Sequence, residues 1–216
     1  MAGGRTRNRV AGRREYTDAH GIMTEESGAA PSKTPDYAPD RTIVLVGLMG
    51  AGKSCIGRRL ADRMGRSFID ADDEIEEAAG CSIPDIFELY GEPAFRDGER
   101  RVIARLLKEP PHILATGGGA FIDEEVRKLI AKKAISVWLR ADLDLLTQRT
   151  ARRGDRPLLA NGNRRKTLKR LMDERYPLYA QADITVDSAR EVPDVTVDRV
   201  LALLAERKDR LAGAAA

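Results

Sequence analysis

The chain has 216 residues, of which 42% are hydrophobic, and its 37 basic and 34 acidic side chains leave a net charge of only +3. This length suggests one domain with additional segments, and the near balance of charge argues against a dedicated nucleic-acid-binding protein, in which one sign of charge dominates a face. No apolar run approaches the roughly 20 residues that span a bilayer, and the two cysteines, Cys55 and Cys81, provide no disulfide framework, as is typical of a reducing compartment.

The first 40 residues differ in composition from the rest. Five arginines precede the first acid, Glu15, and small or polar residues with proline dominate from there to Asp40. Because no helical or strand period is present, we expect a disordered arm over residues 1–40. Three alternatives stay open: a transit peptide, whose arginine-rich signal the acids dilute, a true start at Met23, and a tail that contacts RNA.

A phosphate-binding loop follows. The β-branched run Thr42–Val46 predicts a strand, and Gly47–Ser54 matches the pattern of glycine, four free positions and Gly-Lys-Ser. Ile56, Leu60 and Met64 then recur every four residues, as on the buried face of a helix. A strand, a glycine loop and a helix in this order bind nucleotide phosphates through backbone N–H groups and the helix N-terminus. A glycine-rich turn without a ligand is the weaker interpretation.

Within this loop, two side chains suit phosphate chemistry. Lys53 can reach a β- or γ-phosphate, and the Ser54 hydroxyl can bind Mg²⁺. We expect the nucleotide to contact six consecutive residues, Gly50, Ala51, Gly52, Lys53, Ser54 and Cys55.

Strands and helices alternate along the remaining chain. The further expected strands are Ser67–Asp70, His112–Thr116, Ile135–Leu139 and Ile184–Val186. Helices are expected through Ile75 and Ile83 to Tyr90 with an interruption at Gly80, and over about 93–108, 123–134, 142–150, 164–180 and 195–211. This alternation predicts a parallel, three-layer α/β sheet whose ligands bind beyond the carboxyl ends of the strands. The segment 151–163 lacks any period, as a mobile lid would, within a folded domain expected to span 41–211.

Residues suited to phosphoryl transfer follow the ends of these strands. Asp70 and Asp72 follow the second strand, a triple glycine follows the third, and arginines surround the lid (Gly117, Gly118, Gly119; Arg149, Arg152, Arg153, Arg156). Beside a phosphate loop, one carboxylate suits Mg²⁺ and the other a substrate hydroxyl, although a helix N-cap is the alternative. The bare backbone of the glycines suits close approach of a ligand, and the alternative is a tight turn. The lid arginines suit the γ-phosphate, and the alternative is a solvated basic face. Arg96 and Arg175, taken alone, fit surface residues.

From about Arg41 to Leu204 the chain resembles shikimate kinase, a family in the nucleoside-monophosphate-kinase-like branch of the P-loop proteins. Gluconate and adenylate kinases share the phosphate loop, so the resemblance depends on further stretches in family order: Gly57–Ala61, Phe68–Asp72, Ile75–Glu76, Ser82–Phe87, Gly91–Glu92, Phe95–Arg96, Ala115–Ala120, Arg156–Leu159 and Arg175–Tyr179. It implies a five-stranded parallel sheet of order 2-3-1-4-5 with a mobile lid.

The resemblance also implies a role for each matching position. Lys53 holds the transferring phosphoryl group, Ser54 and Asp70 bind Mg²⁺, and Asp72 orients or deprotonates the attacking hydroxyl. The shikimate carboxylate is held by Arg96 and Arg175, whose planar guanidinium groups suit it, while Gly117, Gly118 and Gly119 offer backbone to the ring. On the nucleotide side the implied residues are Arg156 at the phosphates, Arg149 at adenine and, in the loop Ser188–Pro193, Arg190.

The resemblance therefore implies ATP-dependent phosphorylation of the shikimate 3-hydroxyl, a step of aromatic amino acid biosynthesis. We expect a cytoplasmic monomer that uses ATP and Mg²⁺ and has no nucleic-acid or membrane partner. Two alternatives stay open. A kinase for another small hydroxylated acid, such as gluconate, would differ in substrate preference, and a non-catalytic nucleotide-binding regulator would bind ATP without turnover.

Overall fold

The computed structural model describes residues 39–151 and 163–214, the last six of them as backbone. The predicted N-terminal arm lies almost entirely outside the described residues, as do most of the predicted lid and Arg156 within it. No helix among the described residues combines the length and apolarity that a membrane span requires.

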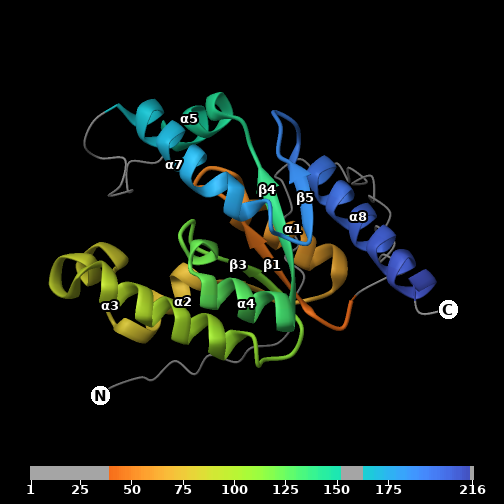
Figure 1. Ribbon diagram of the computed structural model, residues 1–216, viewed down its shortest axis with the longest axis horizontal. Helices are drawn as coiled ribbons and strands as arrows, with labels where there is room; N and C mark the ends of the chain where they lie inside the picture. Colours follow the sequence, from red (N-terminus) through yellow and green to blue (C-terminus); the bar gives the residue numbers. More distant parts are fainter. Residues whose placement is uncertain (1–38, 152–162, 215–216) are drawn as a thin grey trace, which may run out of the picture. The chain divides into compact units, whose positions relative to one another are not determined.

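Five parallel strands form one sheet with the order β2-β3-β1-β4-β5, which confirms the predicted topology (Figure 1). The strands are β1 (Thr42–Val46), β2 (Phe68–Asp70), β3 (Ile113–Ala115), β4 (Ala134–Arg140) and β5 (Ile184–Asp187). Every residue of the central strand β1 is buried, because helices cover both faces of the sheet. Its run of apolar, β-branched residues is therefore the expected sequence of a strand without a solvent face.

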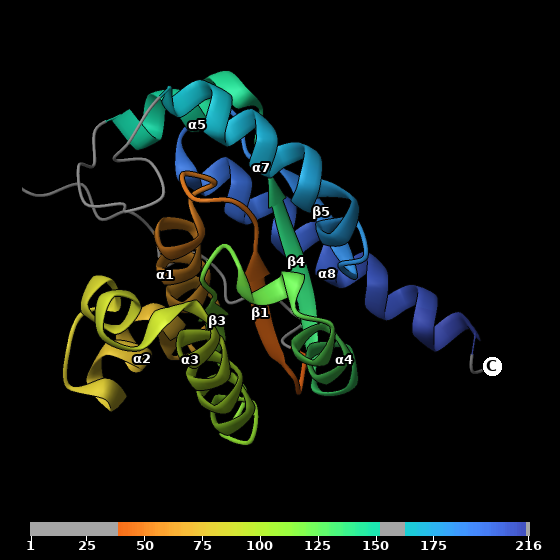
Figure 2. The same cartoon turned by 60° about the vertical axis from the view of Figure 1, so that its left-hand side comes forward.

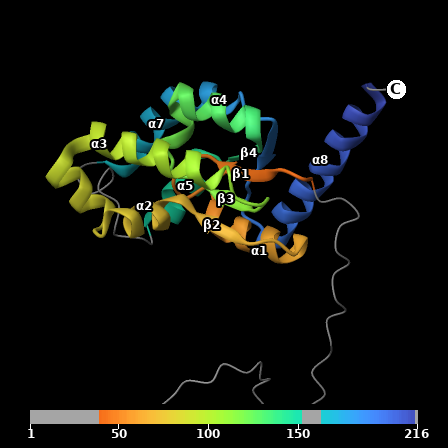
Figure 3. The ribbon, with the colours of Figure 1, turned by 90° about the horizontal axis from the view of Figure 1, so that it is seen from below.

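The helices are α1 (Lys53–Met64), α2 (Ala71–Ala79), α3 (Ile83–Leu106), α4 (Glu124–Lys133), α5 (Leu143–Ala151), α7 (Arg164–Tyr179) and α8 (Pro193–Ala214), with a short 3₁₀ helix η1 (Ala120–Ile122). Figure 3 shows α1 on one side of the sheet and α4 on the other. The turned view in Figure 2 shows α5 and α7 side by side beyond the tip of β4.

Local sequence signals explain most helix ends. Gly65 and Gly80 end α1 and α2 in the left-handed conformation, with φ of 62° and 68°. The prediction of two helices within residues 83–108 agrees with the structure, because α3 consists of two helical stretches that meet at a non-helical residue. Gly91, with φ 77° and ψ 171°, kinks that element at the point where the prediction separated the helices.

The carboxyl ends of the strands place the predicted functional residues at one edge of the sheet. The phosphate loop follows β1, Asp70 ends β2 and caps α2, and the triple glycine follows β3. Arg96 lies on α3, Arg149 on α5 and Arg175 on α7, so helices from several connections supply the remaining groups.

Candidate active site

The loop between β1 and α1 surrounds the start of that helix. Gly47, Gly50 and Gly52 have φ of 140°, 85° and 100°, a region that other residues rarely adopt. At Gly47 a Cβ would also lie 2.7 Å from the carbonyl oxygen of Leu139. The Lys53 ammonium donates to the carbonyl oxygens of Gly47 (2.8 Å) and Leu48 (3.2 Å). Lys53 and the N-terminus of α1 line one concave surface, whose positive charge favours an anion.

Ser54 and Asp70 join the start of α1 to the end of β2. The Ser54 hydroxyl donates to Asp70 Oδ2 at 2.7 Å, and Asp70 Oδ1 accepts from the Asp72 backbone N–H at 3.2 Å. Asp70 is therefore both the N-cap of α2 and the partner of Ser54. A hydroxyl and a carboxylate oxygen fit Mg²⁺, which takes few protein ligands and completes its shell with water and phosphate oxygens.

The triple glycine is the meeting point of three side chains from three helices. A Cβ on Gly117 would lie 2.7 Å from Asp72 Oδ1, and a Cβ on Gly119 would lie 2.6 Å from Arg96 Nη2. Between them, Arg175 Nη1 donates to the carbonyl oxygen of Gly118 at 2.9 Å. The structure thus brings Asp72, Arg96 and Arg175 together around bare backbone. A side chain at Gly117 or Gly119 would displace these groups, whereas a Cβ at Gly118 would make ordinary van der Waals contacts.

Gly118 also connects this cluster with the phosphate loop. A Cβ at Gly118 would lie 3.6 Å from the carbonyl oxygen of Gly47 and 3.6 Å from the backbone nitrogen of Met49. The two halves of the candidate site are therefore in van der Waals reach of each other. A group bound at the triple glycine would lie next to one bound in the phosphate loop.

Sequence reasoning missed Glu99, which holds Arg96 in place. Glu99 is 2% exposed, and its Oε2 accepts from Arg96 Nη1 at 2.7 Å. Burial raises the pKa of the Glu99 carboxyl, although Arg96 opposes this. Burial alone would lower the pKa of Arg96, but the hydrogen bond to Glu99 and its charge outweigh it, so this pKa is raised. The sequence did contain a signal for this pairing, because Glu99 follows Arg96 by three residues on a predicted helix and side chains at that spacing are neighbours.

The concave surface at the phosphate loop is a cavity of about 350 Å³. Arg149 lines it and donates to the carbonyl oxygens of Gly50 (3.3 Å) and Ala51 (3.4 Å), to Ser188 Oγ (2.9 Å) and to the carbonyl oxygen of Ala189 (3.0 Å). The phosphate loop and the segment after β5 are thus joined by one guanidinium group. The other lining residues include Gly52, Lys53, Ser54, Cys55, Glu191 and Pro193.

The structure places only one of the other two predicted nucleotide-binding arginines. Arg190 does not line this cavity but a neighbouring hollow with Gln148 and Val192. Arg156 falls outside the described residues. Glu191, which sequence reasoning did not single out, lines the cavity and accepts from both terminal nitrogens of Arg199 at 2.6 and 2.8 Å.

With this geometry in place, the chain can be compared with known proteins. Residues 49–205 match the family profile described as shikimate kinase. The chain belongs to the shikimate kinase family. The shikimate kinase of Paramagnetospirillum magneticum is 62% identical over 161 residues, which cover 74% of this chain and 83% of the relative. The shikimate kinase of Caulobacter vibrioides is 57% identical over 171 residues, covering 78% of this chain and 86% of the relative.

A solved structure agrees with the sequence relatives. The shikimate kinase from Acinetobacter baumannii in complex with shikimate superposes with a TM-score of 0.75 at 39% identity, covering 78% of this chain and 94% of that one. The predicted family, the α/β fold with its strand order and the predicted shikimate kinase activity are confirmed.

Proposed function

We propose that this shikimate kinase transfers the γ-phosphoryl group of ATP to the 3-hydroxyl of shikimate, giving shikimate 3-phosphate and ADP. The observation that carries the proposal is the closeness of Gly118 to the phosphate loop, where a Cβ built at Gly118 would lie 3.6 Å from the Gly47 carbonyl oxygen and from the Met49 nitrogen. It supports in-line transfer between two substrates held side by side, where positioning and charge neutralisation supply most of the catalysis.

On the nucleotide side, the proposal assigns phosphate binding to the backbone from Gly50 to Cys55 and to Lys53. Lys53 exchanges its loop carbonyl partners for phosphate oxygens and stays with the phosphoryl group as charge develops. Arg149 faces the adenosine half of ATP in the cavity that it lines. Arg190 lies in the segment after β5 but lines the neighbouring hollow and not this cavity. Arg156 is proposed as the lid arginine at the phosphates.

Mg²⁺ is proposed to be held by Ser54 and Asp70, whose oxygen atoms are already 2.7 Å apart. A bound Mg²⁺ neutralises charge on the β- and γ-phosphates. The protein's own contribution here is to hold these two oxygen donors beside the phosphate loop.

On the acceptor side, Arg96 and Arg175 are proposed to bind the shikimate carboxylate, and Asp72 its hydroxyls. The backbone of Gly117, Gly118 and Gly119 supports the ring. The attacking oxygen forms a bond to the γ-phosphorus while the bond from that phosphorus to the bridging β,γ-oxygen breaks. Asp72 accepts a hydrogen bond from the attacking hydroxyl, whose proton leaves through its carboxylate to solvent.

The remaining proposals concern the whole chain. We propose a kinase domain over 41–211 and a monomer in the cytoplasm, while the arm expected over 1–40 and the lid expected at about 151–163 lie almost entirely outside the described residues. No nucleic-acid or membrane partner is proposed.

ADP release measured with and without shikimate tests the proposed function. We expect Mg²⁺-dependent release that requires shikimate and gives one shikimate phosphate per ADP. Faster release with gluconate than with shikimate would favour a different acceptor, and ATP binding without turnover in the presence of shikimate would contradict catalysis.

A further inference from the structure

Helix α3 contacts the segment after β3 at two successive turns. Arg96 lies against Gly119, where a Cβ would be 2.6 Å from its Nη2. Arg100, four residues later on α3, donates through Nη1 to Asp123 Oδ2 at 2.9 Å. Gly119 and Asp123 are likewise four residues apart and bracket η1. The proposed carboxylate-binding contact and the ion pair are therefore about one helical turn apart, roughly 6 Å along α3.

The Asp123 side chain is held in place by backbone hydrogen bonds. Its Oδ1 accepts from the backbone N–H groups of Glu125 (2.9 Å) and Val126 (3.2 Å), so it is the N-cap of α4. Burial would raise the pKa of Asp123, but its hydrogen bonds with Val126 and Arg100 outweigh this and lower it. The carboxylate is therefore ionised at neutral pH, and its side chain is 18% exposed.

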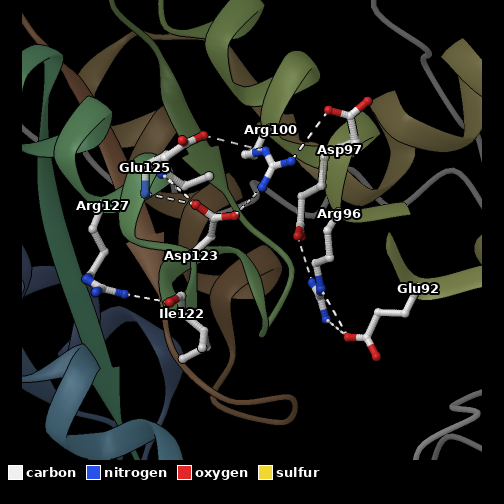
Figure 4. Close-up of polar contacts among 10 residues, drawn as sticks. Glu92, Arg96, Asp97, Arg100, Ile122, Asp123, Glu125 and Arg127 are labelled. Atoms are coloured by element: carbon white, nitrogen blue, oxygen red, sulfur yellow. Dashed lines mark hydrogen bonds and ion pairs between the residues drawn. The ribbon is translucent and has the colours of Figure 1, made fainter. Parts of the chain in front are cut away.

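Arg100 reaches across the gap between α3 and the start of α4, with acids on both sides (Figure 4). Besides Asp123, it lies 3.5 Å from Asp97 on its own helix and 3.8 Å from Glu125 on α4. On α4, Arg127 donates to the carbonyl oxygens of Phe121 (2.9 Å) and Ile122 (2.7 Å), which ties η1 to the same helix. The segment from Gly119 to Asp123 thus accepts hydrogen bonds from Arg127 on α4 and from Arg100 on α3.

Apolar packing does not fix this geometry by itself. Apolar side chains bury α3 in the core on both sides of the ion pair, with Phe95 next to Arg96 and Val102, Ile103 and Leu106 beyond Arg100. Hydrophobic contacts are non-directional, so they tolerate small rotations and shifts of a helix. A charged hydrogen bond to a capped carboxylate is directional. The ion pair therefore restrains the part of α3 that carries Arg96.

We propose that Arg100 and Asp123 are positioning residues for shikimate, because their ion pair sets the position of Arg96 on α3 relative to the backbone of Gly119. This inference rests on the proposed function, in which Arg96 binds the substrate carboxylate. Neither residue touches the substrate. Their contribution is pre-organisation, which lowers the entropy lost when substrate binds.

The test compares four variants with the wild-type full-length chain. Arg100→Ala removes the pair, and Asp123→Ser retains an N-cap oxygen for α4 but is too short and uncharged to hold Arg100. The double variant measures coupling between the two residues. The matched control is Arg101→Ala, which removes the next arginine on α3, a 78%-exposed side chain paired with Asp97. Coupled ADP release gives KM for each substrate and kcat, and thermal unfolding confirms that each variant is folded.

In Arg100→Ala and Asp123→Ser we expect KM for shikimate to rise about three- to five-fold, the range that a partly exposed ion pair supports. KM for ATP and kcat should change less than about two-fold, because the nucleotide side does not depend on the pair. The double variant should resemble the single variants, and Arg101→Ala should resemble the wild type.

An unchanged KM for shikimate in Arg100→Ala, an equal rise in Arg101→Ala, or effects that multiply in the double variant would each overturn the inference. Failure of the proposed function looks different. It would appear as a wild-type chain that releases no shikimate-dependent ADP, whereas failure of the inference alone leaves wild-type turnover intact.

Discussion

Glu99 and Arg96 form a hydrogen-bonded ion pair within α3, in which the carboxylate is almost fully buried and the guanidinium faces the triple glycine. Glu99 Oε2 lies 2.7 Å from Arg96 Nη1, while a Cβ on Gly117 would lie 3.0 Å from the other carboxylate oxygen. The same Cβ would lie 2.7 Å from Asp72 Oδ1, and the charge of Asp72 adds to the burial that raises the pKa of Glu99. Burial and the charge of Asp72 therefore oppose ionisation of the carboxyl group that pairs with Arg96, while Arg96 favours it.

Glu99→Gln should change how stability depends on pH. Burial raises the pKa of Glu99 above its ordinary value of 4.5. The contribution of such a group to the free energy of unfolding is fully present below that ordinary value and is lost as the pH rises through the raised pKa. Glutamine does not ionise and lacks this loss. We expect the free energy of unfolding of the wild type minus that of the variant to fall in urea titrations as the pH rises from below 4.5 through the raised pKa of Glu99. A difference that stayed constant, or rose, would contradict the assignment.

Gly119→Ala should impair shikimate binding while leaving the fold intact. The new Cβ would lie 2.6 Å from Nη2 and 2.7 Å from Cζ of Arg96, so the flexible guanidinium has to move away from its place beside Glu99. We expect KM for shikimate to rise at least about ten-fold, with KM for ATP and Tm nearly unchanged.

The matched control for this substitution is Gly98→Ala on α3. No atom lies within 4 Å of a Cβ built at Gly98, so alanine should stabilise the helix by about 0.5–1 kcal/mol. Normal shikimate kinetics in Gly119→Ala, or an equal defect in Gly98→Ala, would show that displacement of Arg96 is not the cause.

Periodicity and turn chemistry were sufficient to predict the sheet, the phosphate loop and most helices, because these are local properties of the chain. The strand order came from the family resemblance. Asp70 shows the limit of reasoning about single motifs. The sequence offered an N-cap or a functional carboxylate as alternatives, whereas the structure makes Asp70 the cap of α2 and the partner of Ser54 at once.

Pairings between distant elements could not be predicted in this way. Arg100 and Asp123 are separated by 23 positions, and nothing in either local sequence indicates that α3 and the start of α4 lie side by side. The same holds for the contacts of Arg149 with Ser188 and Ala189. The pairing of Glu99 with Arg96 was easier to predict, because the two residues lie one turn apart on the same helix. The burial of Glu99, however, depends on the packing of the whole site.

Arg149→Lys should weaken ATP binding. Arg149 contacts both the phosphate loop and the segment after β5 through two different nitrogens, Nη1 and Nη2. A lysine keeps the charge, but a single ammonium cannot reproduce this planar, two-sided arrangement. We expect KM for ATP to rise about five- to ten-fold, with KM for shikimate unchanged.

Arg140→Lys is the corresponding control, because Arg140 pairs with Asp187 on the neighbouring strand at an exposed position outside the nucleotide cavity. It should leave both KM values near those of the wild type. If instead Arg149→Lys bound ATP normally in a calorimetric titration, the assignment of Arg149 to the adenosine half of the site would be wrong.

Lys53→Met should abolish most turnover without unfolding the protein. The side chains are similar in length, and methionine loses the ammonium that donates to Gly47 and Leu48 and is proposed to follow the phosphoryl group. Since charge stabilisation at the transferring group is worth several kcal/mol, we expect kcat to fall by at least about 100-fold, with a smaller change in KM for ATP. Single-turnover ADP release, with Tm as the measure of folding, separates loss of chemistry from loss of structure. A folded Lys53→Met variant with a near-normal rate would place the catalytic cation elsewhere in the site.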